Sequence, residues 1–146
     1  MEKTLIIIKP DGVLRGKIGE VISRFENVGL KIVGAKMIRF SEKLARTHYS
    51  EHEGKPFFES LLNYVRMSPV LLMVVEGENA IEICRKLAGA TNPSKALPGT
   101  IRGDFGISGE EIFNILHASD SAKAAEREID LFFSDSEIFS YEKIWF

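Results

Sequence analysis

One histidine stands in a segment whose composition suggests chemistry. His117 lies in the segment Asn114–Ser121, which reads NILHASDS and is followed by small and charged residues. This composition predicts a loop, and loops carry functional residues more often than the scaffold does. Imidazole titrates near neutral pH, so it can act both as a nucleophile and as a proton carrier. Because an isolated loop histidine is most often a solvated bystander, the octamer alone leaves both interpretations open.

Two side chains near His117 are of the types that support nucleophilic catalysis. Glu128 follows eleven residues later, at the start of a predicted strand. A carboxylate bonded to one ring nitrogen would fix the tautomer and raise the nucleophilicity of the other nitrogen. Ser119 carries a hydroxyl that can donate to the ring or to a leaving oxygen. Separation along the chain does not measure contact, so this pairing is a hypothesis.

Several basic residues are placed where they could hold phosphate groups. Arg85 precedes the glycine- and proline-containing segment 89–109, Arg102 lies within it, and Lys9 leaves an apolar run directly before a proline. Arginine binds phosphate through paired charge-assisted hydrogen bonds, and glycine lets backbone amides approach closely. Scattered cations usually coat a solvated surface. Lys9 is the exception, because its place at the end of a buried strand restricts its direction.

Other motifs do not support a metal or nucleotide site. His48 and His52 have the i, i+4 spacing of zinc-binding helices, but Tyr49 stands where a metalloprotease has its glutamate. They are therefore predicted to be surface histidines near a helix end. The segment Gly12–Ile18 has too few residues between its glycines for a phosphate-binding P-loop and lacks the final serine or threonine. No G-x-G-x-x-G motif occurs.

Length and composition set the broad class. The chain has 146 residues, of which 45% are hydrophobic, and this predicts a single domain over residues 1–146. The net charge of -2 lacks the basic excess of most nucleic-acid-binding proteins. The one cysteine, Cys84, excludes an internal disulfide. The sequence has no signal-peptide pattern and no apolar run near the roughly 20 residues of a membrane span, so a cytoplasmic location is expected.

Hydrophobic periodicity predicts the elements that position these side chains. Strands are predicted at 4–8, 31–40, 69–75 and 129–133, helices at 18–29, 42–49, 55–65 and 79–87, and a functional loop at 89–109. This order predicts an α+β fold with a ferredoxin-like split βαβ arrangement, in which a four-stranded antiparallel sheet carries helices on one face. The same order fits an RNA-recognition domain, so the fold alone does not decide the function.

Six motifs, in order, resemble the nucleoside diphosphate kinase family over nearly the whole chain. They are KPDG at 9–12, HY at 48–49, PFF at 56–58, TNP at 91–93, PGTIRGDF at 98–105 and NILHASDS at 114–121. Each motif is modest alone, but six in this order are specific. His117 falls on the phosphohistidine nucleophile of the family, and by resemblance the phosphate would be carried on its pros nitrogen.

The resemblance implies a reaction and its ligands. The enzyme would move the γ-phosphoryl group of a nucleoside triphosphate to His117 and then to a nucleoside diphosphate, a ping-pong mechanism that maintains the nucleotide pools. Magnesium (Mg2+) would be carried on the nucleotide phosphates, with no protein metal ligands. Phosphoryl transfer needs positioning and charge neutralisation more than covalent machinery from the protein. No membrane contact and no dedicated nucleic-acid site are expected.

The resemblance also assigns the residues around the nucleotide. The nucleotide-binding set is Lys9, Tyr49, Phe57, Leu61, Arg85, Thr91, Arg102 and Asn114. Lys9, also assigned to the catalytic set, and Asn114 would lie near the sugar hydroxyls. Phe57 would stack on the base with Leu61 nearby, and stacking accepts any base because every base has a π-face. Glu128 and Ser119 fall on the histidine-orienting carboxylate and its supporting hydroxyl.

Some features depart from the family pattern or extend it. The stretch 106–113 is longer than the pattern by about two residues, Ala118 replaces the commoner glycine, and Ser68 stands where glycine is usual. The aromatic tail 144–146 resembles the hexamer-forming members, so a homo-hexamer is expected over a tetramer. A catalytically silent scaffold would be expected to lack His117 or Lys9, and both are present.

Overall fold

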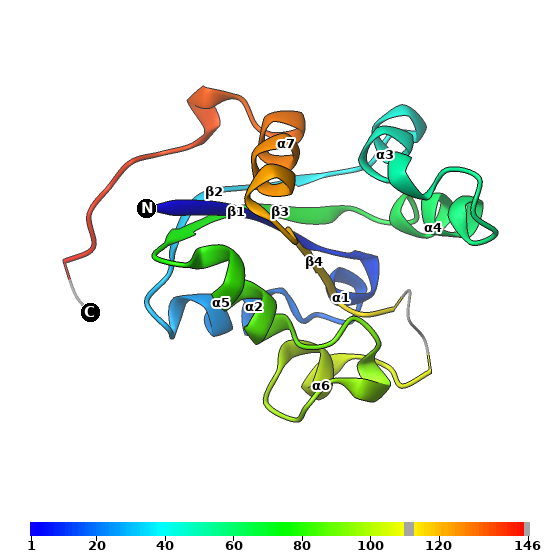
Figure 1. The fold of residues 1–146 in the computed structure, drawn as a ribbon, viewed down its shortest axis with the longest axis horizontal. Helices are drawn as coiled ribbons and strands as arrows, with labels where there is room; N and C mark the ends of the chain where they lie inside the picture. Colours follow the sequence, from blue (N-terminus) through cyan, green and yellow to red (C-terminus); the bar gives the residue numbers. More distant parts are fainter. Residues whose placement is uncertain (110–112, 145–146) are drawn as a thin grey trace.

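A computed structural model of the chain describes residues 1–109 and 113–144 (Figure 1). The strands are β1 (Glu2–Ile8), β2 (Lys31–Ile38), β3 (Val70–Gly77) and β4 (Leu116–Ala118). The helices are α1 (Pro10–Leu14), α2 (Ile18–Glu26), α3 (Glu42–His48), α4 (Phe58–Val65), α5 (Ala80–Ala88), α6 (Ile101–Phe105) and α7 (Ala122–Phe132). Three short 3-10 helices are η1 (Ser50–His52), η2 (Pro93–Lys95) and η3 (Asp135–Glu137).

The four strands form one sheet in the order β2-β3-β1-β4. Each neighbouring pair is antiparallel, and β1 pairs along its whole length with β3 while its other edge pairs with the short β4. The predicted α+β class and four-stranded antiparallel sheet are confirmed. The prediction that residues 1–146 form a single domain stays a prediction.

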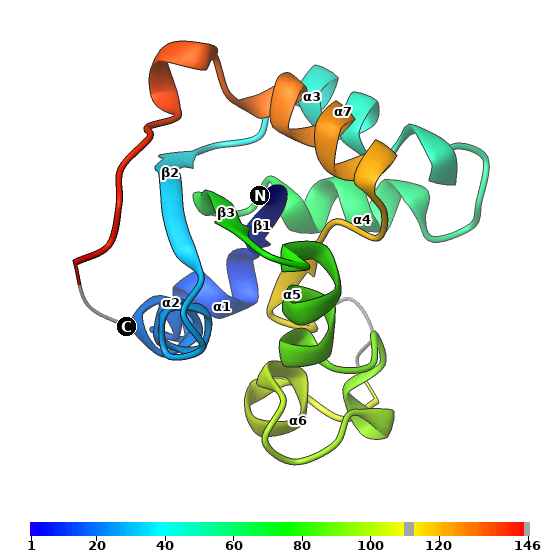
Figure 2. The same ribbon diagram turned by 60° about the vertical axis from the view of Figure 1, so that its left-hand side comes forward.

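Helices cover both faces of the sheet, so the prediction of helices on one face is wrong (Figures 1 and 2). Leu5 and Ile7 of β1 belong to a core cluster shared with α3, α4 and α7. Ile6 and Ile8 belong to a second cluster shared with α2 and α5. The unbroken apolar run of β1 reflects this burial on both sides. An RNA-recognition domain needs an exposed sheet face, so this arrangement also removes that alternative.

The fourth strand was predicted in the wrong place. Residues 129–133, predicted to form it, lie mostly in α7, and the strand is Leu116–Ala118 instead. The buried positions of α7 include Ala125, Glu128 and Phe132, which recur at helical spacing. The Ser121 side chain caps this helix by accepting a hydrogen bond from the Ala124 amide at 3.0 Å. A short apolar run fits a strand or a helix equally well, and the Ser121 cap favours the helix here.

The segment 89–109, predicted to be a long loop, contains η2 and α6. Asn92 caps η2 by accepting from the Ser94 amide, and Thr100 caps α6 by accepting from the Gly103 amide. Gly103 is required by space, because a Cβ there would lie 2.0 Å from the carbonyl oxygen of Leu97. This compact subdomain lies beside α5 (Figure 2). It brings Thr91 and Arg102 to the edge of the sheet.

The C-terminal segment follows the outer edge of β2. The amide of Phe139 donates to the Val33 carbonyl at 2.8 Å, and the Tyr141 hydroxyl donates to the Ile32 carbonyl at 2.6 Å. The last two residues of the predicted hexamer-type tail, and residues 110–112 of the longer stretch 106–113, lie outside the described residues. In the described chain, no helix has the length and apolar character needed to cross a membrane.

Candidate active site

His117 lies in strand β4, which corrects the prediction of a loop. It stands opposite Ile7 of β1 in the antiparallel register. Side chains alternate along a strand, so His117 points to the same side of the sheet as Ile7, the side covered by α3 and α7. The small, polar sequence around it suits a three-residue edge strand that ends in a helix cap.

The backbone just before His117 is tightly held. Ile115 has a φ of +72°, a left-handed conformation that a β-branched residue rarely adopts. Its amide donates to the Asp11 carboxylate at 3.0 Å, and its carbonyl accepts from the Lys9 amide at 2.8 Å. The Tyr64 hydroxyl donates to the same carboxylate. The turn between β1 and α1 therefore fixes the entry into β4, and strained backbone of this kind is common at functional sites.

Glu128 contacts His117 as the sequence suggested, whereas the Ser119 hydroxyl bonds to Glu128 and not to the ring. Nε2 of His117 and Oε1 of Glu128 are 2.8 Å apart, and the Ser119 hydroxyl donates to the same oxygen at 2.7 Å. Burial alone would raise the pKa of Glu128, but the hydrogen bonds from His117 and Ser119 bring it below its ordinary value. An ionised carboxylate only accepts hydrogen bonds, so the proton of a neutral His117 belongs on Nε2. Nδ1 then keeps its lone pair.

Lys9 is a buried cation next to Asn114. Its ammonium donates to the Asn114 side-chain oxygen at 2.7 Å, and the Asn114 amide donates to the Thr91 carbonyl at 3.0 Å. Burial, followed by the charge of Arg102, lowers the pKa of Lys9 to about 8. Desolvation disfavours a lone ammonium, so an anion at this position would be attracted strongly.

Arg102 and Arg85 are both anchored to the backbone near His117. Arg102 is buried and donates to the carbonyls of Asn114, Gly89 and Leu116 at 3.1, 3.0 and 2.7 Å. A guanidinium has five N–H groups, so it can hold this framework and still donate to an anion. Arg85 donates to the Ala118 carbonyl at 3.1 Å. Both arginines therefore combine a fixed position with a positive charge, which suits phosphate binding.

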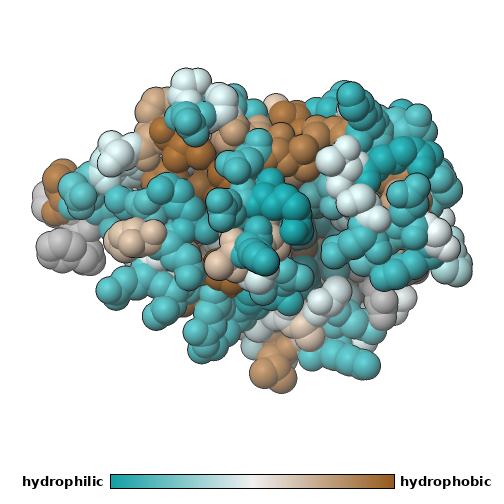
Figure 3. All heavy atoms as spheres, turned by 45° about the horizontal axis from the view of Figure 1, so that its top comes forward, coloured by the Kyte–Doolittle hydropathy of each residue, from teal (hydrophilic) through white to brown (hydrophobic). Residues whose placement is uncertain are grey.

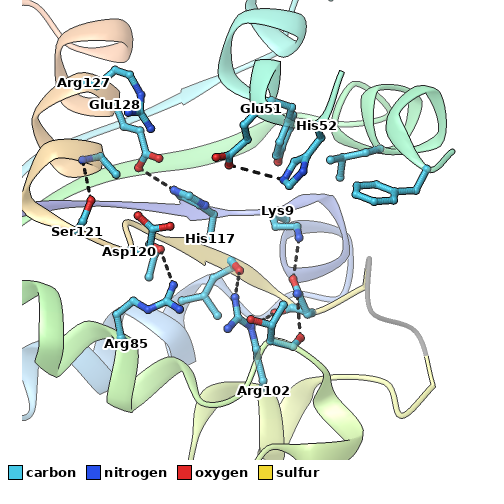
Figure 4. A pocket seen from close by; sticks show the side chains of 18 residues that line it. Lys9, Glu51, His52, Arg85, Arg102, His117, Asp120, Ser121, Arg127 and Glu128 are labelled. Carbon is cyan, nitrogen blue, oxygen red and sulfur yellow. Dashed lines mark hydrogen bonds and ion pairs between the residues drawn. The ribbon is translucent and has the colours of Figure 1, made fainter. Parts of the chain in front are cut away.

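All these side chains meet in one cavity of about 590 Å³ (Figure 4). Its lining includes His117, Glu128 and the whole predicted nucleotide-binding set, which is Lys9, Tyr49, Phe57, Leu61, Arg85, Thr91, Arg102 and Asn114. Ser119 is fully buried behind Glu128. The cavity therefore joins residues from β4, from helices α4, α5, α6 and α7, and from connecting segments. Its volume is in the range of small-molecule sites.

Further lining residues were not identified from the sequence. They include Glu51, Asp120, Ser121 and Arg127. Asp120 and Ser121 belong to the motif around His117, so the motif itself was a signal for them. Arg127 directly precedes Glu128 on α7, and only the helical assignment of this segment could have placed it at the cavity. His52 also lines the cavity, with its ring 5.3 Å from that of Phe57.

His48 differs from its predicted surface position. Both nitrogens of its ring are buried and lack a hydrogen-bond partner among the described residues. The ring centroids of His48 and His117 are 5.1 Å apart. Burial, followed by the proximity of His117, lowers the pKa of His48 to about 3. The His48 ring thus packs against the candidate nucleophile and carries no charge near neutral pH.

The acidic residues of the cavity suit a metal that arrives on a ligand. Among residues 1–109 and 113–144, no group of three or more histidine, cysteine or acidic side chains is arranged to hold a metal ion. The cavity offers the carboxylates of Glu51, Asp120 and Glu128, and Glu128 is engaged by His117 and Ser119. Magnesium bound with substrate phosphates usually takes one or two carboxylates, or none, and keeps several waters.

Comparisons with known proteins agree along the chain. The nucleoside diphosphate kinase family matches residues 2–138. The nucleoside diphosphate kinase of Pyrococcus furiosus is 59% identical, over 100% of this chain and 92% of its own, and that of Archaeoglobus fulgidus is 57% identical, over 98% and 93%.

Solved structures give the same result. The halophilic nucleoside diphosphate kinase of Halobacterium salinarum, in complex with CDP, has a TM-score of 0.94 at 46% identity over 98% of this chain and 94% of its own. The enzyme of Borrelia burgdorferi, a transition state mimic with bound vanadate and ADP, has a TM-score of 0.90 at 46% identity over 98% and 93%. The chain therefore belongs to the nucleoside diphosphate kinase family, the enzymes that transfer phosphate between nucleoside tri- and diphosphates.

Proposed function

We propose that the phosphate travels on Nδ1 of His117 in a ping-pong reaction. The observation that carries this proposal is the 2.8 Å contact between Nε2 of His117 and Glu128. This contact favours the tautomer with the ring proton on Nε2 and an available lone pair on Nδ1, on a ring that lines the cavity. Nδ1 is the pros nitrogen, which is the position that the family resemblance implies.

The cavity favours one orientation of the nucleotide. One part of its lining holds the cations Lys9, Arg85 and Arg102, and the last two donate to backbone carbonyls of β4, which suits phosphates beside His117. Another part holds the apolar side chains Phe57 and Leu61, which suit the flat face of a base. Relatives bind ligands of this kind, namely CDP in the Halobacterium salinarum enzyme and ADP with vanadate in the Borrelia burgdorferi enzyme.

The first half-reaction exchanges one bond to phosphorus for another. The Nδ1 lone pair of His117 forms the new bond as the bond between the γ-phosphorus and its bridging oxygen breaks, and the diphosphate leaves with the electron pair. No proton has to be removed from the nucleophile, because Nδ1 carries none. The ring retains its Nε2 proton and gains positive charge, which the Glu128 carboxylate stabilises at 2.8 Å. The second half-reaction reverses these steps onto an acceptor diphosphate.

Magnesium would enter on the nucleotide phosphates. When bound there, it neutralises charge on the phosphate oxygens. Besides Glu128, which is engaged by His117 and Ser119, the described carboxylates of the lining are Asp120 and Glu51, and these would hold water coordinated to the ion. Within the protein, Lys9, Arg85 and Arg102 bind the phosphate oxygens, and Glu128 with Ser119 holds the proton on Nε2.

The phosphohistidine can be tested directly. Incubation with γ-labelled ATP and magnesium should label the protein on His117, as an acid-labile, alkali-stable phosphoamidate. The His117→Asn variant should take up no label and lose turnover. As a matched control, His52→Asn removes another ring of the cavity and should still be labelled on His117. An alkali-labile acyl phosphate, or label on His117→Asn, would contradict the mechanism.

We also propose that the chain self-associates. The described surface exposes Met37, Phe139 and Ile144, with exposed fractions of 52%, 64% and 75%. Figure 3 shows apolar side chains reaching the surface in patches on a face that is otherwise largely polar. Apolar surface of this kind is typical of interfaces. Light scattering coupled to gel filtration should give the mass of a hexamer; a tetramer would correct the assembly size, and a monomer would contradict the proposal.

A further inference from the structure

His48 is a buried polar side chain that the reaction above does not use. It is the last residue of α3, and neither of its ring nitrogens has a hydrogen-bond partner among the described residues. Leaving a buried polar group unpaired is destabilising, so such groups are rare in folded proteins. An apolar ring would be the more stable choice here.

The His48 ring stands at right angles to that of His117. The two centroids are 5.1 Å apart and the planes make an angle of 82°. The rings of Tyr49 and Phe132 pack on His48 with centroid distances of 4.5 and 5.2 Å, and that of Phe40 lies at 6.0 Å. Edge-to-face packing of this kind is a favoured geometry for aromatic pairs. These neighbours leave the His48 ring little freedom, so it forms a rigid wall beside His117.

The nucleophile needs such a wall because its hydrogen bond restrains it incompletely. Glu128 holds the His117 ring at Nε2, which lies on the far side of the ring from Cβ. Rotation about the bond between Cβ and the ring moves Nε2 little and moves Nδ1 more. Rotation about a bond to an sp² ring is intrinsically soft. A neighbour packed at right angles limits this rotation, and phosphoryl transfer is sensitive to the resulting alignment.

The wall also has to be uncharged. During the proposed attack the His117 ring gains positive charge, and a second cation about one ring away would oppose it. Burial, and then the proximity of His117, lowers the pKa of His48 to about 3, with Glu128 acting in the opposite direction. His48 is therefore neutral near neutral pH, where the nucleotide phosphates and Glu128 are ionised.

We propose that His48 is a positioning residue for phosphoryl transfer, whose rigid ring at right angles to His117 fixes the plane of the imidazole and aims Nδ1 at the incoming phosphorus. This inference rests on the proposed function, in which His117 carries the phosphate. His48 does not touch the reacting atoms in this scheme. Its effect is on the rate of transfer and not on nucleotide affinity.

Single-turnover phosphorylation by γ-labelled ATP with magnesium, in rapid-quench experiments on the full chain, tests the proposal. His48→Ala should slow phosphorylation at saturating ATP by about tenfold to a hundredfold, with the dissociation constant of ATP within about twofold of the original. His48→Phe restores a ring of similar shape and should recover the rate to within about threefold of the original. Val33→Ala is a truncation in the core cluster that contains Tyr49 and Phe132, the neighbours of His48, but in a strand that supplies no cavity residue. It should lower stability without slowing phosphorylation.

Several results would overturn the proposal. They are an unchanged rate in His48→Ala, a rate in His48→Phe as low as in His48→Ala, or a slowing by Val33→Ala as large as by His48→Ala. If His48→Ala does not fold, His48→Leu takes its place and is compared with His48→Phe in the same assay. A His117→Asn variant that still takes up label would instead defeat the proposed function. That result is separate from any comparison among the His48 variants.

Discussion

At the inner end of the cavity the reacting groups lie on a strand and a long helix, whereas at the mouth the base-facing ring of Phe57 belongs to the irregular chain between α3 and α4. The side chains of His117 and Glu128 are 24% and 9% exposed. Phe57, at the end of that irregular chain, is 43% exposed as a residue. Hydrogen bonds of 2.8 and 2.7 Å join Glu128 to His117 and to Ser119. The Phe57 ring instead packs near the His52 ring, with centroids 5.3 Å apart, and near the Lys55 ammonium, 5.8 Å from its centroid.

This difference matches the two tasks of the reaction. In-line transfer loses rate when the nucleophile moves by a fraction of an ångström, so it needs groups on rigid elements. Accepting many nucleobases needs a surface that binds a π-face without reading its edge. The comparison therefore predicts that changes at the reacting groups reduce the rate of phosphoryl transfer, and that changes at groups that only hold the nucleotide weaken its binding.

The largest effect is expected from Glu128→Ala. Loss of the carboxylate frees the ring proton to occupy either nitrogen and removes the charge that stabilises the phosphorylated ring. We expect single-turnover phosphorylation to slow by about a hundredfold to ten-thousandfold, with ATP affinity nearly intact. Glu126→Ala, an exposed change two residues earlier on α7, is the matched control. Equal losses of rate and affinity would show that Glu128 has another role.

Lys9→Gln removes the ammonium that we assign to phosphate binding. It should weaken ATP binding by about tenfold to a hundredfold. The pKa of Lys9 in the free protein is lowered to about 8, and bound phosphate favours the charged form. The original protein should therefore bind ATP with constant affinity just below about pH 8 and progressively less tightly above it. Lys9→Gln should lose this decline, and Lys3→Gln, in the strand that precedes Lys9, should retain it. Calorimetric titration at several pH values measures both; a decline that persists in Lys9→Gln would assign the titration to another group.

The smallest effect is expected from Phe57→Ala at the mouth. Removal of the stacking ring should raise the dissociation constants of ATP and CTP alike by about fivefold to tenfold. Phosphorylation at saturating nucleotide should be unchanged, because the inner groups are untouched. Met67→Ala, another exposed apolar side chain after α4, is the control. A loss confined to one base, or a slower transfer step, would break the distinction between the two ends.

The sequence predicted the residues of the site better than it predicted the elements that carry them. The predicted nucleotide-binding residues all line one cavity with His117 and Glu128. The signal for them lay in motifs of several residues in a given order, and such motifs keep their meaning without any knowledge of contact. The element that carries the nucleophile was misassigned, because a three-residue edge strand is too short to show a period of two.

What the sequence determined by itself is the set of residue types at the site and the continuous apolar strand that they flank. The tertiary structure decided which of them meet. Only the packing of α7 on the sheet brings Glu128 to Nε2, across eleven residues of chain. Only the end of α3 brings a second imidazole against His117, one whose nitrogens have no hydrogen-bond partner in the part of the chain that the structure describes. The reason is physical: local propensity and periodicity act within a few residues, whereas ring orientation and proton position depend on neighbours that folding brings from distant parts of the chain.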